Sequence, residues 1–338
     1  MELSERRSQI LKYIVEQYVA DARPVGSERI ARQYAAVSSA TIRNDMAALE
    51  EVGLITQPHT SAGRVPTDAG YRFYVQHLMR DRELSPTEQR TIRHQFHQVE
   101  SDVDEWVHLA SSVLAHSVGT AAVVTPPVSP RARVRRVELL PVQEDVALLA
   151  LILPSGAVRE RLIHHDQPLA REELQRLANQ LSAELEDKGA EQVEQAAARA
   201  TGFAARVIGA IARLLRHAEE QAFSEIYYEG LSHMLEQPEF ANSARLKPIV
   251  EVLERADVLA RLLRDAPGTG GVRVIIGSEH ALEQMRNTAV VLTRYGSGDE
   301  IVGVLGVLGP TRLPYWRAVP MVRFMAGLLD LLVEGSFR

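Results

Sequence analysis

The first 53 residues carry three helical patterns, and the breaks between them constrain the fold more than any other feature. Ser4 can cap a helix over residues 4–20, which Pro24-Val25-Gly26 separates from a short helix ending near Tyr34. After a tight connection, a longer helix begins at residues 38–39 and ends at Gly53, a residue type that favours helix C-termini. This order predicts a helix-turn-helix pair.

The segment after Gly53 completes a winged helix-turn-helix pattern. Residues 54–56 and 64–66 flank a polar turn and predict a small hairpin, and a further helix is expected to start at Thr67-Asp68. In this fold the second helix of the pair lies in the major groove of DNA, where its N-terminal residues contact base edges. The first 80 residues are therefore expected to bind double-stranded DNA.

One side of the longer helix has the chemistry of a DNA-reading surface. An apolar stripe is expected to face the core, formed by Ile42, Met46, Leu49 and Val52. On the opposite side, Arg43 can donate two hydrogen bonds to guanine and Asn44 can pair with adenine. The predicted DNA-contacting residues of this helix are Ser39, Ala40, Thr41, Arg43, Asn44 and Ala47. The alternative is that Arg43 and Asn44 are ordinary solvated residues.

The hairpin turn has the character of a DNA-contacting wing. Its tip has small residues and no acidic ones, and the negative potential of a minor groove attracts arginine. The predicted wing contacts are His59, Thr60, Ser61, Gly63 and Arg64. The predicted phosphate contacts are Ser27, Ser38 and Arg72. The alternatives are an ordinary polar hairpin for the wing, and plain capping or solvation for Ser27 and Arg72.

The composition excludes several classes of protein. The chain has 338 residues and no cysteine, which excludes a disulfide framework, cysteine-type zinc sites and thiol catalysis. It has no apolar run of the roughly 18 residues that a membrane span needs, and its charged N-terminus is not a secretory signal, so we expect a cytoplasmic protein. Residues 1–80 hold ten Lys/Arg against nine Asp/Glu, and the remainder 28 against 35. DNA binding must therefore depend on where individual cations lie.

The rest of the chain mixes helical and β-rich patterns, which predicts an α+β multidomain fold. Helices are expected over 87–117, 170–187, 189–240, 244–265 and 315–333, and strands over 119–125, 133–141, 145–153, 156–163, 272–276, 288–295 and 300–308. The predicted domains are a winged helix-turn-helix domain over 1–85, an α+β domain in two parts over 86–188 and 244–338, and a mainly helical module inserted between them over 189–243.

No catalytic or metal-binding pattern stands out in this body. His164-His165-Asp166 is the one cluster of metal-ligand types, but adjacent residues on a strand point to opposite faces. No GxSxG, HExxH or P-loop pattern occurs. Four arginines between 131 and 136 indicate a solvated sheet edge or, alternatively, a contact with spacer DNA. We therefore predict no catalytic residue, no metal site, no cofactor and no enzymatic activity.

Three sequence blocks together resemble the HrcA family of heat-inducible transcription repressors. The run SSATIRNDMAALEEVGLITQPHTSAGRVPTDAGYRFYV (38–75) is similar to the family signature. VIIGSE (274–279) and GVLGVLGPTRLPYWRAVPMV (303–322) resemble its C-terminal motifs. The resemblance covers nearly the whole chain and is weakest in the alanine-rich insert.

The resemblance implies a bacterial repressor of chaperone operons that binds an inverted-repeat operator, the CIRCE element, as a homodimer. It implies a GAF-like fold for the second domain, into which a dimerising module is inserted. It also implies a GroE chaperonin that keeps the repressor active until heat draws the chaperonin to unfolded proteins. The DNA-contacting role then falls on the helix and wing residues given above.

An inverted operator requires a protein with two-fold symmetry, and the insert offers a surface for it. One helix there has an apolar face, which consists of Phe203, Val207, Ile211, Leu214 and Leu215. We predict that this face joins two copies of the chain. The alternative is that it packs within its own subunit.

Two other functions stay open. A GAF-like body with a polar-lined pocket would make the chain a winged-helix regulator that responds to a small molecule. An enzyme with a DNA-targeting head would need a cleft that gathers Asp, Glu and His side chains.

Overall fold

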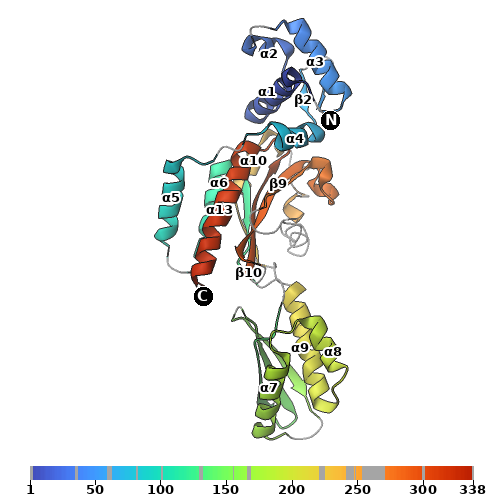
Figure 1. Cartoon of the computed structure of the whole chain (residues 1–338), viewed down its shortest axis with the longest axis vertical. Helices are drawn as coiled ribbons and strands as arrows, with labels where there is room; N and C mark the ends of the chain where they lie inside the picture. Colours follow the sequence, from blue (N-terminus) through green and yellow to red (C-terminus); the bar gives the residue numbers. More distant parts are fainter. Residues whose placement is uncertain are drawn as a thin grey trace. The chain divides into compact units, whose positions relative to one another are not determined.

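The computed structural model describes residues 3–34, 37–58, 63–80, 83–99, 102–128, 132–154, 156–165, 169–220, 225–240, 247, 249–252, 271–298 and 301–336. The chain forms two compact units (Figure 1). The first comprises Met1–Pro126, Ile226–Tyr295 and Val304–Leu332, and the second comprises Pro127–Glu225, Gly296–Gly303 and Val333–Arg338. Within the described ranges, no helix combines the length and the apolar character that crossing a membrane requires.

The N-terminal part of the first unit is a winged helix-turn-helix head. Its elements are α1 (Glu5–Asp21), α2 (Ser27–Gln33), α3 (Ser39–Glu51), β1 (Ile55–Thr56), β2 (Val65–Pro66), α4 (Asp68–Phe73) and the π-helical turn η1 (Tyr74–Leu78). Ser4 and Ser38 cap α1 and α3 as predicted, since each hydroxyl accepts a backbone N–H three residues on. The N-cap of α2 is Gly26, whereas Ser27 is its first residue.

The core of the head follows the helical periodicity with one exception. Its α1 and α3 residues are Ile10, Leu11, Ile14, Val15, Val19, Ile42, Met46 and Leu49. The prediction for Val52 is wrong, because α3 ends at Glu51 and the side chain of Val52 is 45% exposed.

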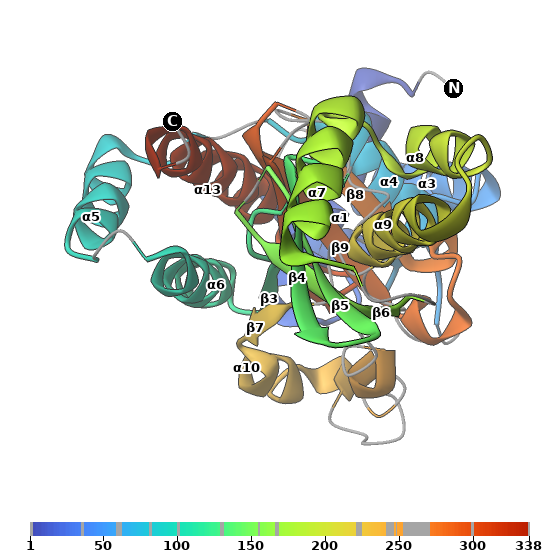
Figure 2. The same ribbon diagram turned by 90° about the horizontal axis from the view of Figure 1, so that it is seen from below.

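The body of the first unit is a sheet with the strand order β7-β3-β10-β9-β8. These strands are β3 (Ala121–Val124), β7 (Tyr227–Glu229), β8 (Arg273–Ile276), β9 (Thr288–Ser297) and β10 (Ile301–Pro310). The helices are α5 (Pro86–His97), α6 (Val103–Val118), α10 (Leu231–Leu235) and α13 (Tyr315–Ser336), and the short 3-10 turns are η2 (Pro238–Phe240), η3 (Gly277–Glu279) and η4 (Glu283–Met285). Helices α6 and α13 are neighbours on one side of the sheet (Figures 1 and 2).

Two expectations for this body differ from the structure. The single helix expected over 87–117 is divided into α5 and α6, because the carboxylate of Asp102 accepts a hydrogen bond from Asp104 N at 2.9 Å and caps a new helix. Strand β7 lies in a stretch that was expected to be helical, and it pairs with β3. The helix expected over 244–265 lies mostly outside the described residues.

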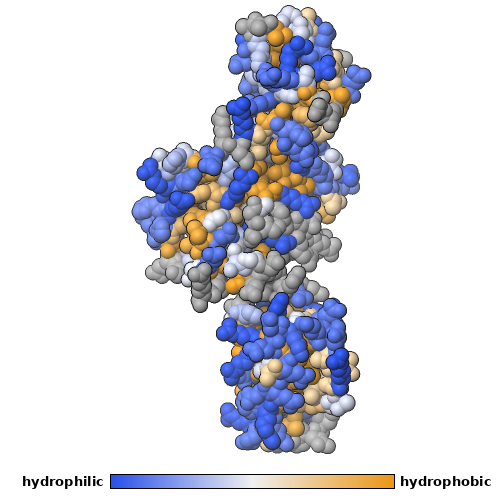
Figure 3. Space-filling view, in the orientation of Figure 1, coloured by the Kyte–Doolittle hydropathy of each residue, from blue (hydrophilic) through white to orange (hydrophobic). Residues whose placement is uncertain are grey.

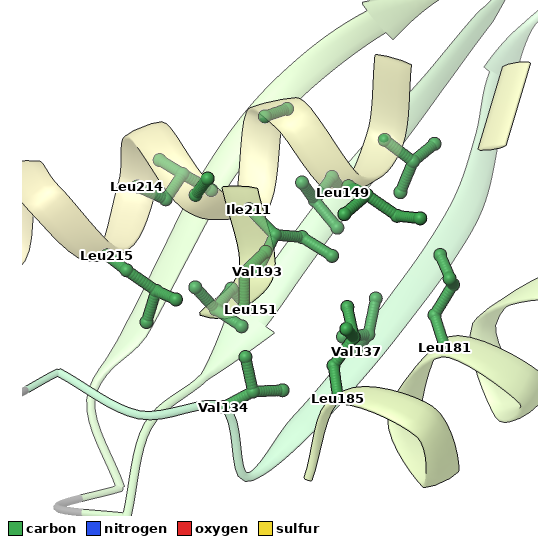
Figure 4. Close-up of a cluster of buried hydrophobic side chains, with 14 of the residues drawn as sticks. Val134, Val137, Leu149, Leu151, Leu181, Leu185, Val193, Ile211, Leu214 and Leu215 are labelled. Carbon is green, nitrogen blue, oxygen red and sulfur yellow. The ribbon is translucent and has the colours of Figure 1, made fainter. Parts of the chain in front are cut away.

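The second unit packs helices on one antiparallel sheet with the strand order β4-β5-β6. Its elements are β4 (Arg136–Gln143), β5 (Val146–Ile152), β6 (Val158–His164), α7 (Arg171–Leu185), α8 (Ala190–Ala197) and α9 (Gly202–Glu220). Leu149 and Leu151 of β5 share one buried cluster with Leu181 of α7 and Ile211 of α9 (Figure 4). The same cluster includes residues of β4, β6 and α8, so a single hydrophobic core holds these six elements together.

The two units divide the chain at different places from the predicted domains. Residue 189, the predicted start of the insert, lies inside the second unit, because β4–β6 pack directly on α7–α9. The second unit therefore combines a sheet with its helices, and it begins near residue 127.

Candidate nucleic-acid interface

The predicted reading residues of α3 lie on its exposed side. Ala40, Arg43, Asn44 and Ala47 are exposed, and Ser39 and Thr41 are partly buried near the helix N-terminus. The buried side consists of Ile42, Asp45, Met46 and Leu49. The arrangement leaves a cation, an amide and two small side chains free to approach another molecule.

Asp45 is a buried residue of α3 that the sequence interpretation missed. Arg6 Nε donates to its Oδ2 at 2.6 Å, and Arg7 Nε donates to its Oδ1 at 3.2 Å. The side chain of Asp45 is 4% exposed, whereas those of Arg6 and Arg7 are 55% and 43% exposed. The hydrogen bond from Arg6 contributes most to lowering the pKa of Asp45 below 3.8, and burial opposes it.

These ion pairs fix the rotation of α3 about its own axis. Asp45 follows Asn44 directly, so anchoring its carboxylate to the N-terminus of α1 turns Asn44 and Arg43 outward. The sequence held a signal for this, because a helical wheel places Asp45 60° from Ile42 on the inward side of α3.

Four hydroxyl groups lie at the N-terminal ends of α2 and α3, those of Ser27, Ser38, Ser39 and Thr41. Ser27 Oγ and Ser39 Oγ lie 3.1 Å apart, and Ser38 Oγ accepts a hydrogen bond from Thr41 N at 3.2 Å. A helix N-terminus attracts anions through its free N–H groups and its dipole. The geometry is compatible with a phosphate at the start of α3.

The base of the wing contacts both the segment between α1 and α2 and helix α3. The backbone of Arg64 exchanges two hydrogen bonds of 2.9 Å with Val25, and a Cβ on Gly63 would lie 2.4 Å from the carbonyl carbon of Val25. Arg64 Nη2 also pairs with Glu50 Oε2 at 2.8 Å. The other predicted wing residues, His59, Thr60 and Ser61, lie outside the described residues.

Arg72 is not placed as a phosphate contact. Its Nε donates to Glu279 Oε1 at 2.6 Å, and its Nη2 donates to the carbonyl oxygen of Val274 at 2.6 Å and to Glu279 Oε2. The phosphate prediction for Arg72 is corrected accordingly, because its Nε and Nη2 groups donate to residues inside the first unit.

The predicted dimer face on α9 lies in the core of the second unit. Ile211 and Leu215 have no exposed area and Leu214 is 9% exposed (Figure 4). Val207 is also fully buried, and Phe203 packs against this core and against the ring of His165. The dimer prediction for this face is corrected, because the sheet of its own subunit covers it. The apolar face of a strongly amphipathic helix must be covered, and the sequence did not show whether a second copy or the same subunit covers it.

The opposite face of that sheet exposes apolar side chains. The register aligns Leu140 with Leu148 and Leu148 with Leu162, and on the same face it aligns Ile152 with Val158. Leu140, Val158 and Leu162 are 43%, 48% and 57% exposed. Helices α7, α8 and α9 lie on the other side of the sheet (Figure 2), and the surface that they present is mostly hydrophilic (Figure 3).

The histidines at the end of β6 do not form a metal site with described residues. His164 is exposed and His165 is buried, as expected for neighbours at the end of a strand, and Asp166 lies outside the described residues. Across the described part of the chain, no three side chains of His, Asp or Glu gather to hold an ion.

Comparisons with known proteins match both parts of the chain. Residues 2–78 match a family model described as a winged helix-turn-helix transcription repressor, HrcA DNA-binding, and residues 104–319 match the HrcA protein C terminal domain. A heat-inducible transcription repressor HrcA from Roseiflexus castenholzii is 43% identical, covering 98% of this chain and 95% of its own. One from Thermomicrobium roseum is 44% identical, covering 99% and 96%. A crystal structure described as a hypothetical protein matches with a TM-score of 0.59 at 25% identity, covering 99% of both chains.

Proposed function

Since the chain belongs to the HrcA family of heat-inducible transcription repressors, we propose that it binds an inverted-repeat, CIRCE-type operator as a homodimer. The observation that carries this proposal is the exposed side of α3, where Arg43 and Asn44 are free while Asp45 holds the other side of the helix. Arg43 reads guanine by two hydrogen bonds, and Asn44 reads adenine.

The remaining contacts position the head on the duplex. The small side chains of Ala40 and Ala47 allow close approach and can meet thymine methyl groups, while Ser27, Ser38, Ser39 and Thr41 lie where phosphates would pass. The proposed wing contacts are His59, Thr60, Ser61, Gly63 and Arg64, with Arg64 also joining the wing to α3 through Glu50.

The proposed dimer uses the exposed face of the β4-β5-β6 sheet. Half-exposed leucine and valine side chains on this face would be buried against the same face of a second copy. Burying one such side chain completely stabilises an assembly by about 1.5 to 3 kcal/mol, so burying the exposed half of each contributes on the order of 1 kcal/mol. In a two-fold interface each residue occurs once in each copy, so its free-energy contribution counts twice.

We assign three roles to the parts of the chain on this basis. The head over 1–85 binds DNA, the α+β body forms the GAF-like domain, and the second unit is the dimerising module, which begins near residue 127. In the bacterial cytoplasm, the GroE chaperonin would keep this repressor active, and heat would release repression by drawing the chaperonin to other clients. The family resemblance supports this control.

Binding to a synthetic CIRCE-type inverted repeat, measured by fluorescence anisotropy at a fixed salt concentration, tests the proposal. We expect specific binding in the nanomolar range, at least 1000-fold tighter than to a scrambled duplex of the same length. Added GroE should raise the active fraction of the protein. Equal affinity for both duplexes would contradict operator recognition, and an unchanged active fraction would contradict chaperonin control.

A further inference from the structure

Two blocks of the C-terminal half hold the head against the body of the first unit. They are the turn Gly277–Glu279 and the segment 311–317, which belong to the motifs VIIGSE and GPTRLPYWR. DNA reading by α3 makes no use of either block, so their chemistry needs another explanation.

The first contact is made by Arg312, whose side chain is 11% exposed. Its Nη1 donates to the carbonyl oxygen of Val19 at 3.0 Å, its Nε donates to Glu239 at 2.5 Å, and its Nη2 donates to Gln237 at 2.6 Å. Val19 lies in the last turn of α1, where carbonyl groups are free and the helix dipole favours a cation. One guanidinium therefore joins the end of α1 to two residues of the body.

The second contact holds α4. Asp68 Oδ2, in the first turn of this helix, accepts a hydrogen bond from Ser278 N at 2.8 Å. Gly277 has a φ of +53°, and a Cβ on it would lie 2.2 Å from the carboxylate of Asp68. Arg72 lies one turn further along α4, and it donates hydrogen bonds to both carboxylate oxygens of Glu279. Burial raises the pKa of Glu279, but the hydrogen bonds from Arg72 and Ile276 N, together with the charges of Arg72 and His280, lower it by more.

Aromatic packing fills the space between the two contacts. The rings of Tyr71 and Tyr315 lie 5.9 Å apart, and those of Tyr74 and Trp316 lie 6.4 Å apart. Tyr71 and Tyr315 are fully buried. The body therefore holds the head at two places, α1 and α4, with packed rings between them. A rotation of the head about either place would have to break the contact at the other.

We propose that Arg312 and the Gly277–Glu279 turn are positioning residues for operator reading, which set the angle of each head and hence the spacing between half-sites that the protein accepts. The proposal rests on the dimeric operator binding proposed above. A dimer reads two half-sites at once only if its heads stand at the matching separation. Neither contact touches Arg43 or Asn44, so a free head would keep its affinity for one half-site and lose its preference for one spacing.

The test compares Arg312→Ala with the unsubstituted protein on duplexes that carry one half-site or two. The two-site duplexes differ in spacer length by steps up to about ten base pairs, one helical turn. We expect binding to a single half-site to stay within about twofold, while the ratio between the best and worst spacers falls at least tenfold. Arg286→Ala, which replaces an arginine of the same unit that is 56% exposed, is the matched control and should change neither quantity.

Gly277→Ala provides an independent variant, because it disturbs the contact with α4 and leaves Arg312 in place. We expect the same loss of spacing preference. A preserved spacing preference in both variants overturns the proposal, and so does an equal loss of affinity for single and paired half-sites. If the unsubstituted protein itself prefers no spacing, the dimeric operator binding fails and the positioning role fails with it.

Discussion

Replacing Asp45 by Asn tests whether the ion pairs of this buried carboxylate with Arg6 and Arg7 hold α3 in place. The substitution keeps the size of the side chain and removes its charge. The new amide can offer one oxygen to Arg6 or Arg7, but its NH₂ group would face a guanidinium, which is also a donor. We expect a less stable head.

The geometry gives the size of the effect. Hydrogen bonds to charged groups contribute roughly 1.5 to 3 kcal/mol when both partners leave water. Here the aspartate is buried but its partners are half exposed, so solvent screens part of the interaction. We therefore expect Asp45→Asn to lower the free energy of unfolding by about 1 to 2 kcal/mol.

Urea unfolding measures this loss. The transition is monitored by the fluorescence of Trp106 and Trp316, both of which lie in the first unit. Because folding lowers the pKa of Asp45, its contribution is present above the ordinary value of 3.8 and is lost as the pH falls through the folded-state pKa. The difference between the two proteins should be constant from pH 8 to 5 and shrink below about pH 4.

Glu28→Gln is the matched control, because Glu28 is an exposed acidic residue of α2. It should leave the free energy of unfolding unchanged within about 0.5 kcal/mol. The reasoning is refuted if Asp45→Asn is as stable as the unsubstituted protein at pH 7, or if its deficit persists undiminished at pH 3.

Three further predictions concern the dimer and the wing. Leu162→Asp, on the exposed sheet face, should yield folded monomers in sedimentation velocity, and a persisting dimer would place the interface elsewhere. Leu214→Asp, which introduces a charge on the buried face of α9, should instead unfold the second unit, as seen by proteolysis; a folded monomer would restore the face of α9 as the interface. Arg64→Ala removes the pair with Glu50 and should weaken DNA binding several-fold, and an unchanged affinity and salt dependence would remove the wing from the proposed interface.

The sequence predicted the head in detail because its elements are short, local and well punctuated. The caps of α1 and α3 and the hairpin depend on residues that are close in the chain, and the wheel of α3 separated exposed Arg43 from buried Ile42. The same wheel places Asp45 on the inward side, but its partners lie 38 and 39 residues away, and helical periodicity does not show which distant residues will pair with it.

The body was predicted less well wherever the outcome depended on distant packing. The apolar face of α9 had to be covered, but its sequence pattern is the same whether the cover is a second subunit or the sheet of its own unit. Strand β7 has three residues, too few for a period of two to show. The contacts of Arg72 with Glu279 join residues 207 apart, so the sequence favoured a simpler role on the surface of the head.

The most direct test of the account measures base preference at the operator with and without the side chain of Arg43. Affinities of the unsubstituted protein, Arg43→Ala and the control Glu51→Ala, which changes an exposed residue at the far end of α3, are compared on operators substituted at one base pair at a time. The account predicts that Arg43→Ala costs about 1 to 3 kcal/mol and abolishes discrimination at one base pair per half-site, while the other positions keep theirs. A uniform loss across all sequences, or no loss, would contradict the claim that the exposed side of α3 reads the operator.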